Sequence, residues 1–69
     1  MMSLAERLRR DRGLTQKEIA KAAGMAPMVV GKIENWRRVR SSSYDRLAAF
    51  LGVPVRDLLR DFAENCDAS

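Results

Sequence analysis

The sequence predicts an all-α fold, a compact five-helix bundle over residues 1–63 followed by a frayed C-terminal tail over residues 64–69. Three observations predict this class. The chain has 69 residues, enough for one domain, and 46% of them are hydrophobic, which suffices for a small packed core. Signals that begin and end helices recur along the chain. No segment alternates apolar and polar residues over more than a few positions, so we expect no sheet.

The first two helices are predicted by capping boxes, in which a hydroxyl and a glutamate satisfy the amides at a helix N-terminus. The first box spans residues 3–6 and opens a helix over about residues 4–12, which Gly13 ends. The second box spans residues 15–18, and its helix ends at Gly24. Glycine suits both ends because it adopts a left-handed conformation without a steric clash.

The remaining three helices are predicted by proline, serine and apolar spacing. Pro27 begins a third helix that reaches about Asn35, because proline is tolerated at a first helical position. The serines at 41–43 are cap candidates for a fourth helix over residues 44–51. Pro54 begins a fifth helix, in which apolar residues recur at helical spacing as Val55, Leu58, Leu59 and Phe62.

The composition excludes several kinds of chemistry. Histidine is absent and Cys66 is the one cysteine, which excludes a zinc site of several His or Cys ligands, an internal disulfide and a His-activated nucleophile. Apolar stretches run for only a few residues, far below the roughly 20 that a bilayer requires, and no secretory signal precedes the first helix. We therefore expect a cytoplasmic protein that is not an enzyme, needs no cofactor or metal, and makes no membrane contact.

The charge of the chain is unevenly distributed. The net charge of +4 is the sum of +6 over residues 1–46 and −2 over residues 47–69. A basic part joined to an acidic part is expected when one face of a protein meets nucleic acid.

The second and third predicted helices are separated by only about three residues. Such a tight connection requires a small residue where the helices touch and a residue tolerant of positive φ at the corner, and Ala20 and Gly24 meet these needs. At 100° per residue, Val30 and Ile33 lie on one side of the third helix. The opposite side then presents Met28, Gly31, Lys32 and Asn35.

This pattern resembles the lambda-repressor-like (Cro/CI, Xre-type) helix-turn-helix family. The residues that carry the resemblance run from about Leu4 to Leu59 and include the segment 14–20, Gly24, Val30, Ile33, Glu34, Asn35 and the segment 51–55. The resemblance implies a five-helix bundle whose third helix enters the major groove of double-stranded DNA while its second helix crosses the backbone.

The resemblance also implies roles for single residues. The base-reading positions are Ala26, Pro27, Met28 and Lys32. The candidates for phosphate contact are Thr15, Gln16, Asn35, Arg37, Arg38 and Arg40. Arg9 and Glu34 match an ion pair that ties the first helix to the end of the third.

Two features depart from the family pattern. Relatives often carry Gln, Ser, Thr or Arg where this chain has Pro27, Met28 and Val29, so the usual amide-to-adenine contact is missing. We expect Met28 or Val29 to meet thymine methyl groups while Lys32 donates to guanine, with a protein-binding patch as the alternative. Relatives usually have a left-handed Gly where this chain has Trp36, so we expect Trp36 to take another conformation. We expect its ring to pack against the following loop or the fourth helix, with stacking on nucleic acid as the alternative.

The fifth helix carries an apolar stripe that is longer than a small core needs. Either Phe62 folds back onto the first helix, or Phe62 and Phe50 form a two-fold dimer contact with Cys66 near its far end. Tyr44 is expected at the edge of the core, with a hydroxyl that could reach a phosphate.

The resulting hypothesis is a transcriptional repressor of the prokaryotic nucleoid or a phage-infected host. It would bind a palindromic operator as a homodimer. The alternative is an antitoxin or another interaction module of the same fold, which binds a partner protein and regulates its own operon.

Overall fold

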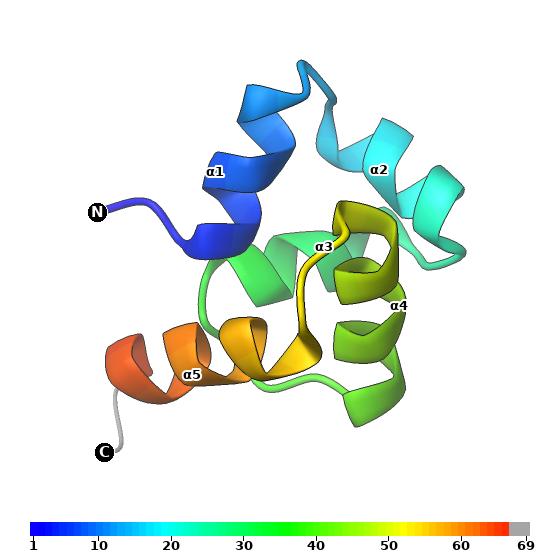
Figure 1. Ribbon diagram of the computed structural model, residues 1–69. Coiled ribbons are helices and arrows are strands. Elements are labelled where there is room, and N and C mark those ends of the chain that lie inside the picture. The colour runs from blue at the N-terminus through cyan, green and yellow to red at the C-terminus, as the bar shows by residue number, and fades with distance from the viewer. Residues whose placement is uncertain (67–69) are drawn as a thin grey trace.

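A computed structural model of the chain describes residues 1–66, and these residues form helices without strands. The helices are α1 (Leu4–Asp11), α2 (Gln16–Ala23), α3 (Pro27–Glu34), α4 (Ser41–Leu51) and α5 (Val55–Asn65). In Figure 1, α1 and α2 lie at one end of the molecule and α5 at the other, with α3 and α4 between them. The predicted all-α class and the five helices are confirmed.

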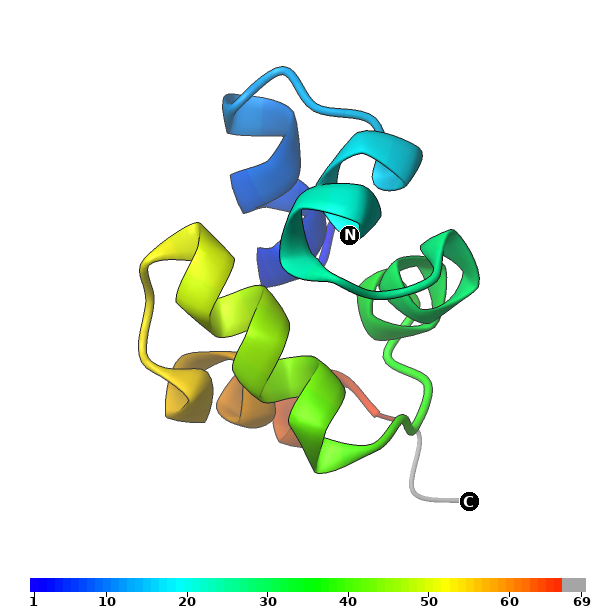
Figure 2. The ribbon, with the colours of Figure 1, turned by 90° about the vertical axis from the view of Figure 1, so that its right-hand side faces the viewer.

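The core lies where all five helices meet. α2 packs against both α3 and α4, and α5 packs against α4 and α1. Figure 2 shows α4 running across the molecule with α5 behind it and α3 to one side. Each large apolar side chain buried there contributes about 1.5–3 kcal/mol. The buried apolar residues are Ala5, Ile19, Ala20, Val30, Ile33, Tyr44, Leu47, Ala48, Leu51 and Leu58.

The two capping boxes differ in the structure. In the second, Thr15 and Glu18 satisfy each other's backbone amides at 2.9 and 3.1 Å, as predicted. In the first, the Ser3 hydroxyl accepts from the amide of Glu6 at 3.1 Å. The Glu6 carboxylate pairs with Arg10, one turn along the same helix, at 2.7 Å. The first box is therefore formed only by its serine half.

The last two helices begin and end at other residues than predicted. α4 begins at Ser41, so the three serines form its first turn rather than its cap, and Arg40 precedes it without a side-chain capping bond. Pro54 is the residue before α5 and not its first helical residue. α5 continues to Asn65, so the tail predicted from residue 64 begins inside the helix, and residues 67–69 lie outside the described part.

Arg12 joins two helix ends that are distant in sequence. Arg12 donates from Nη1 to the Leu8 carbonyl at 3.0 Å and from Nη2 to the Leu51 carbonyl at 2.7 Å. These bonds satisfy carbonyls at the C-terminal ends of α1 and α4, which their own helices leave unbonded.

Over residues 1–66, no helix is long and apolar enough to cross a membrane, and no cluster of three His, Cys, Asp or Glu side chains could hold a metal.

Candidate nucleic-acid interface

The corner between α2 and α3 is built as the sequence predicts. Ala20 is fully buried at the contact of the two helices, and Gly24 adopts the left-handed conformation with φ +75°. The amide of Met25 donates to the Ala20 carbonyl at 2.9 Å and closes the end of α2. Three residues therefore suffice to turn the chain and present α3 at the surface.

The two sides of α3 differ sharply in exposure. Val30 and Ile33 are buried against the core, as their spacing predicts. On the outward side Met28 is 67% exposed, and Lys32 is also exposed. Met28 and Lys32 therefore share the solvent-facing side of α3. The other two base-reading candidates are also exposed, with Ala26 preceding the helix and Pro27 as its first residue.

A buried carboxylate fixes α3 to the two helices before it. Glu34 is only 5% exposed, and its oxygens accept from Arg9 Nε at 2.6 Å and Arg9 Nη2 at 3.1 Å. Arg9 also donates to the Leu14 carbonyl at 2.8 Å. The hydrogen bonds that Arg9 donates to Glu34, and then the negative charge of Glu34, raise the pKa of the Arg9 guanidinium against the opposing effect of burial. The pair expected from the resemblance is present and is bidentate.

The polar candidates at the ends of α2 and α3 already make contacts within the chain. Gln16 donates from Nε2 to Glu34 Oε1 at 2.9 Å, which leaves its amide oxygen and one N–H for another partner. The Thr15 hydroxyl caps α2 by accepting from the amide of Glu18 at 3.1 Å. Asn35 donates to the Gly31 carbonyl at 2.9 Å. All three side chains remain exposed, and the contacts restrict how they are presented.

A basic groove of about 690 Å³ lies between the start of α3 and the segment that leads into α4. Because Arg40 provides no cap, the first amides of α4 have no side-chain acceptor and carry the positive end of the helix dipole. Arg46 donates to the Gly24 carbonyl at 2.8 Å and so joins α4 to the corner. No acidic side chain is among the described lining residues, whose polar members are Lys32, Arg38, Arg40, Ser42, Ser43 and Arg46.

The groove includes residues that the sequence did not single out as ligands. Ser42, Ser43 and Arg46 belong to it, although the serines were predicted only as caps and Arg46 was given no role. The sequence signal that could have indicated this groove is the run of serines at 41–43, which follows an arginine that cannot cap a helix. Such a helix start has unpaired amides and small side chains, which allow an anion to approach closely.

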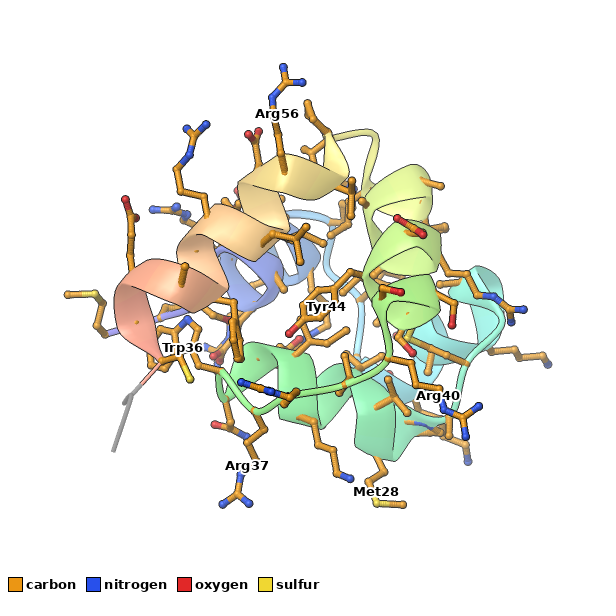
Figure 3. The ribbon with its side chains drawn as sticks, turned by 90° about the horizontal axis from the view of Figure 1, so that it is seen from below. Met28, Trp36, Arg37, Arg40, Tyr44 and Arg56 are labelled. Carbon is orange, nitrogen blue, oxygen red and sulfur yellow. The ribbon has the colours of Figure 1, made fainter. Side chains whose placement is uncertain are left out.

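Several basic side chains that extend into solvent lie on the same side as α3. Figure 3 shows Met28, Arg37 and Arg40 pointing outward there, whereas Arg56 on α5 points outward on the opposite side. Arg37, Arg38 and Arg40 are all exposed. Much of the basic part of the sequence thus lies on one face, where Lys32, Arg38, Arg40 and Arg46 line the groove. Arg9, Arg10 and Arg12 instead make contacts within the bundle, and Arg7 lies beside α5.

Trp36 differs from the sequence prediction in both conformation and partner. It adopts the left-handed conformation with φ +55° that it was expected to avoid. Its indole Nε1 donates to Asp61 Oδ2 on α5 at 3.0 Å, a partner that the sequence did not indicate. A left-handed L-residue costs about 1–2 kcal/mol. A hydrogen bond to a charged group contributes about 1.5–3 kcal/mol, which offsets that cost.

The aromatic residues of α4 and α5 are largely used inside the protein. Tyr44 is 5% exposed and its hydroxyl is buried without a hydrogen-bond partner, so the predicted reach to a phosphate is wrong. Phe62 is half-buried and meets Tyr44 edge to face at 6.1 Å between ring centroids, so it packs on α4. Of the other dimer candidates, Cys66 is half-buried and Phe50 is 39% exposed.

The comparisons with known proteins agree with this geometry. A family model described as helix-turn-helix matches residues 6–58, which include α2, the corner and α3. No curated protein and no solved structure matches the chain. The matched span covers more than half of the 69 residues. The chain therefore belongs to the lambda-repressor-like (Cro/CI, Xre-type) helix-turn-helix family of DNA-binding transcription regulators.

Proposed function

We propose that this regulator is a repressor that binds a near-palindromic operator as a homodimer and acts by occupying promoter DNA. The observation that carries the proposal is the single basic face, on which the outward side of α3 adjoins the groove at the start of α4. Base contacts and phosphate contacts are thereby adjacent, as sequence-specific binding requires.

The dimensions of α3 suit the major groove. Its eight residues form a helix about 12 Å long and about 10–12 Å across with side chains, and the groove is about 12 Å wide. Met28 is the most exposed apolar side chain of α3 and supplies a flexible contact for a thymine methyl group. Lys32, one turn along, donates to guanine O6 or N7. Ala26 and Pro27 allow the backbone to approach the bases closely.

The phosphates on either side of the groove are bound by the segments that flank α3. Gln16 at the start of α2, held by Glu34, contacts one strand, together with Thr15. The groove with Arg38 and Arg40 receives a phosphate of the other strand, which the first amides of α4 also approach. Asn35 and Arg37 lie at the end of α3 and contact the backbone beyond it.

Homodimer formation is proposed because one α3 helix reads only a few base pairs. Two half-sites one helical turn apart have centres about 34–36 Å from each other. The longest axis of the protein extends 32 Å, so two copies placed end to end along it would have centres close to this spacing. The apolar residues available for the contact are Phe50 and Leu59, with exposed fractions of 39% and 43%, together with the exposed edges of Phe62 and Cys66.

Selection of bound duplexes from a random DNA pool tests the proposal. Wild-type protein should enrich two inverted half-sites with centres about 10–10.5 base pairs apart. Lys32→Ala should relax the preference at one base position in each half-site. A matched control, Arg56→Ala on the opposite side, should leave the enriched sequence unchanged. Failure to enrich any sequence would contradict sequence-specific binding, and enrichment of single half-sites would contradict the homodimer.

A further inference from the structure

The end of α3 is formed by a corner that glycine would occupy more easily than tryptophan. The amide of Trp36 donates to the Ile33 carbonyl at 3.2 Å, and the amide of Arg37 donates to the Lys32 carbonyl at 2.8 Å. With φ +55° at Trp36, these bonds close α3 and reverse the chain. Most side chains avoid this conformation, because Cβ approaches the following carbonyl oxygen. A tryptophan here needs a compensating contact.

The compensating contact is one carboxylate that joins three parts of the chain. Asp61 Oδ2 accepts from Trp36 Nε1 at 3.0 Å and from the amide of Leu4 at 3.2 Å. Its other oxygen lies 3.3 Å from Nδ2 of Asn65, in the next turn of α5. Figure 3 shows Trp36 between α5 and the segment that leaves α3. The exit of α3, the start of α1 and the middle of α5 therefore meet at Asp61.

The segment after this corner has little else to define its path. No backbone hydrogen bond joins the amides of residues 38–40 to another residue in the described part of the chain. Val39 packs partly against the core, and α4 begins only at Ser41. Arg37 and Arg38, by contrast, extend into solvent directly after the corner. Their placement therefore depends on the residue at which the chain turns.

We propose that Trp36 is a positioning residue for DNA binding, and that its hydrogen bond to Asp61 sets the path of the basic segment 37–40. The inference rests on the proposed function, because it assigns those arginines to phosphates. The left-handed corner alone would need only glycine, whereas the indole fixes the direction in which the chain leaves the corner. α5 is then part of the DNA-binding apparatus without touching DNA.

Two substitutions separate the corner from the hydrogen bond. Trp36→Gly keeps the left-handed corner, which glycine adopts freely, and removes the whole side chain. Trp36→Phe keeps an aromatic ring and removes only the indole N–H. Asn65→Ala is the matched control, because it removes a contact of Asp61 that does not involve the basic segment.

The experiment measures the affinity of each variant for a pool-selected duplex by fluorescence anisotropy at several salt concentrations. Each phosphate contact contributes about 0.9 to the slope of log affinity against log salt. We expect both Trp36 variants to bind about tenfold more weakly and to lose about 1–2 units of slope, with Asn65→Ala unchanged. Unchanged slopes in both variants would overturn the positioning role, even if affinity falls. A flat salt dependence for wild type would instead contradict the proposed function.

A second measurement tests the hydrogen bond without DNA. Trp36 is the only tryptophan, so its indole N–H gives a single, assignable NMR signal. We expect this hydrogen to exchange with solvent slowly in wild type and in Asn65→Ala, and at least tenfold faster in Asp61→Ala. Equal exchange rates in wild type and Asp61→Ala would show that the hydrogen bond does not form in solution, and would overturn the inference.

Discussion

Removal of the Glu34 carboxylate should destabilise the domain strongly. The Arg9 side chain is 11% exposed, and Glu34→Ala would leave its guanidinium buried with only the Leu14 carbonyl as a hydrogen-bond acceptor. Breaking a buried pair from one side costs about 3–5 kcal/mol. Because the hydrogen bond from Arg9 to the Leu14 carbonyl remains, we expect the loss in the free energy of unfolding to lie at the lower end of this range, about 3 kcal/mol. A domain of this size has roughly 3–10 kcal/mol of stability in all.

Urea unfolding followed by circular dichroism measures this loss. With an m-value near 1 kcal/mol/M, a loss of about 3 kcal/mol lowers the midpoint by about 3 M. The double variant Arg9→Met/Glu34→Met removes both charges and should recover most of the loss, because an apolar replacement of a buried pair is often nearly neutral. A loss below about 1 kcal/mol in Glu34→Ala would refute the reasoning. Failure of the double variant to recover would show that lost packing, not the stranded charge, is the cause.

Three further substitutions test other contacts. Tyr44→Phe should raise the free energy of unfolding by about 1 kcal/mol, because it removes a buried hydroxyl without a partner and keeps the ring contact with Phe62. Thermal melting should show a Tm about 4–8 °C higher. A lower Tm would count against a buried, unpaired hydroxyl. Hydrogen bonds from the Thr15 amide and hydroxyl lower the pKa of Glu18 in the folded protein. The contribution of Glu18 to the free energy of unfolding is therefore complete above the unfolded pKa of about 4.3 and is lost as pH falls through the lower folded value. Urea midpoints measured from pH 6 to 3 should therefore fall less steeply in Glu18→Gln than in wild type, and parallel curves would refute the capping role. Arg12→Met should cost about 1 kcal/mol in urea unfolding, because the carbonyls of Leu8 and Leu51 lose their donor, whereas the exposed control Arg7→Met should cost nothing measurable.

The parts of the fold that depend on residues close together in the sequence could be predicted from the sequence. Gly24 and Ala20 define the corner through conformation and size alone, and the second capping box is complete within four residues. The exposed side of α3 follows from helical phase once Val30 and Ile33 are assigned to the core. The family pattern supplied the partner of Arg9, which lies 25 positions away in sequence.

The parts that depend on distant contacts could not be predicted in this way. Trp36 tolerates a left-handed conformation because Asp61, 25 positions later, accepts its indole N–H. From the neighbouring residues alone, such a tryptophan is predicted to be unfavourable, because the steric cost of the left-handed conformation is known but the hydrogen bond to Asp61 is not. The groove likewise requires the start of α4 to lie beside the corner, where Arg46 reaches the Gly24 carbonyl.

The central claim, that the basic face binds double-stranded DNA through its phosphates and bases, is tested most directly by the salt dependence of binding. Anisotropy titrations of a pool-selected duplex would be made from about 50 to 200 mM salt. A homodimer with three or four arginine or lysine contacts to phosphates in each copy should give a slope of roughly −5 to −7 in log affinity against log salt. A slope near zero, or equal affinity for the selected duplex and a scrambled one, would contradict the claim.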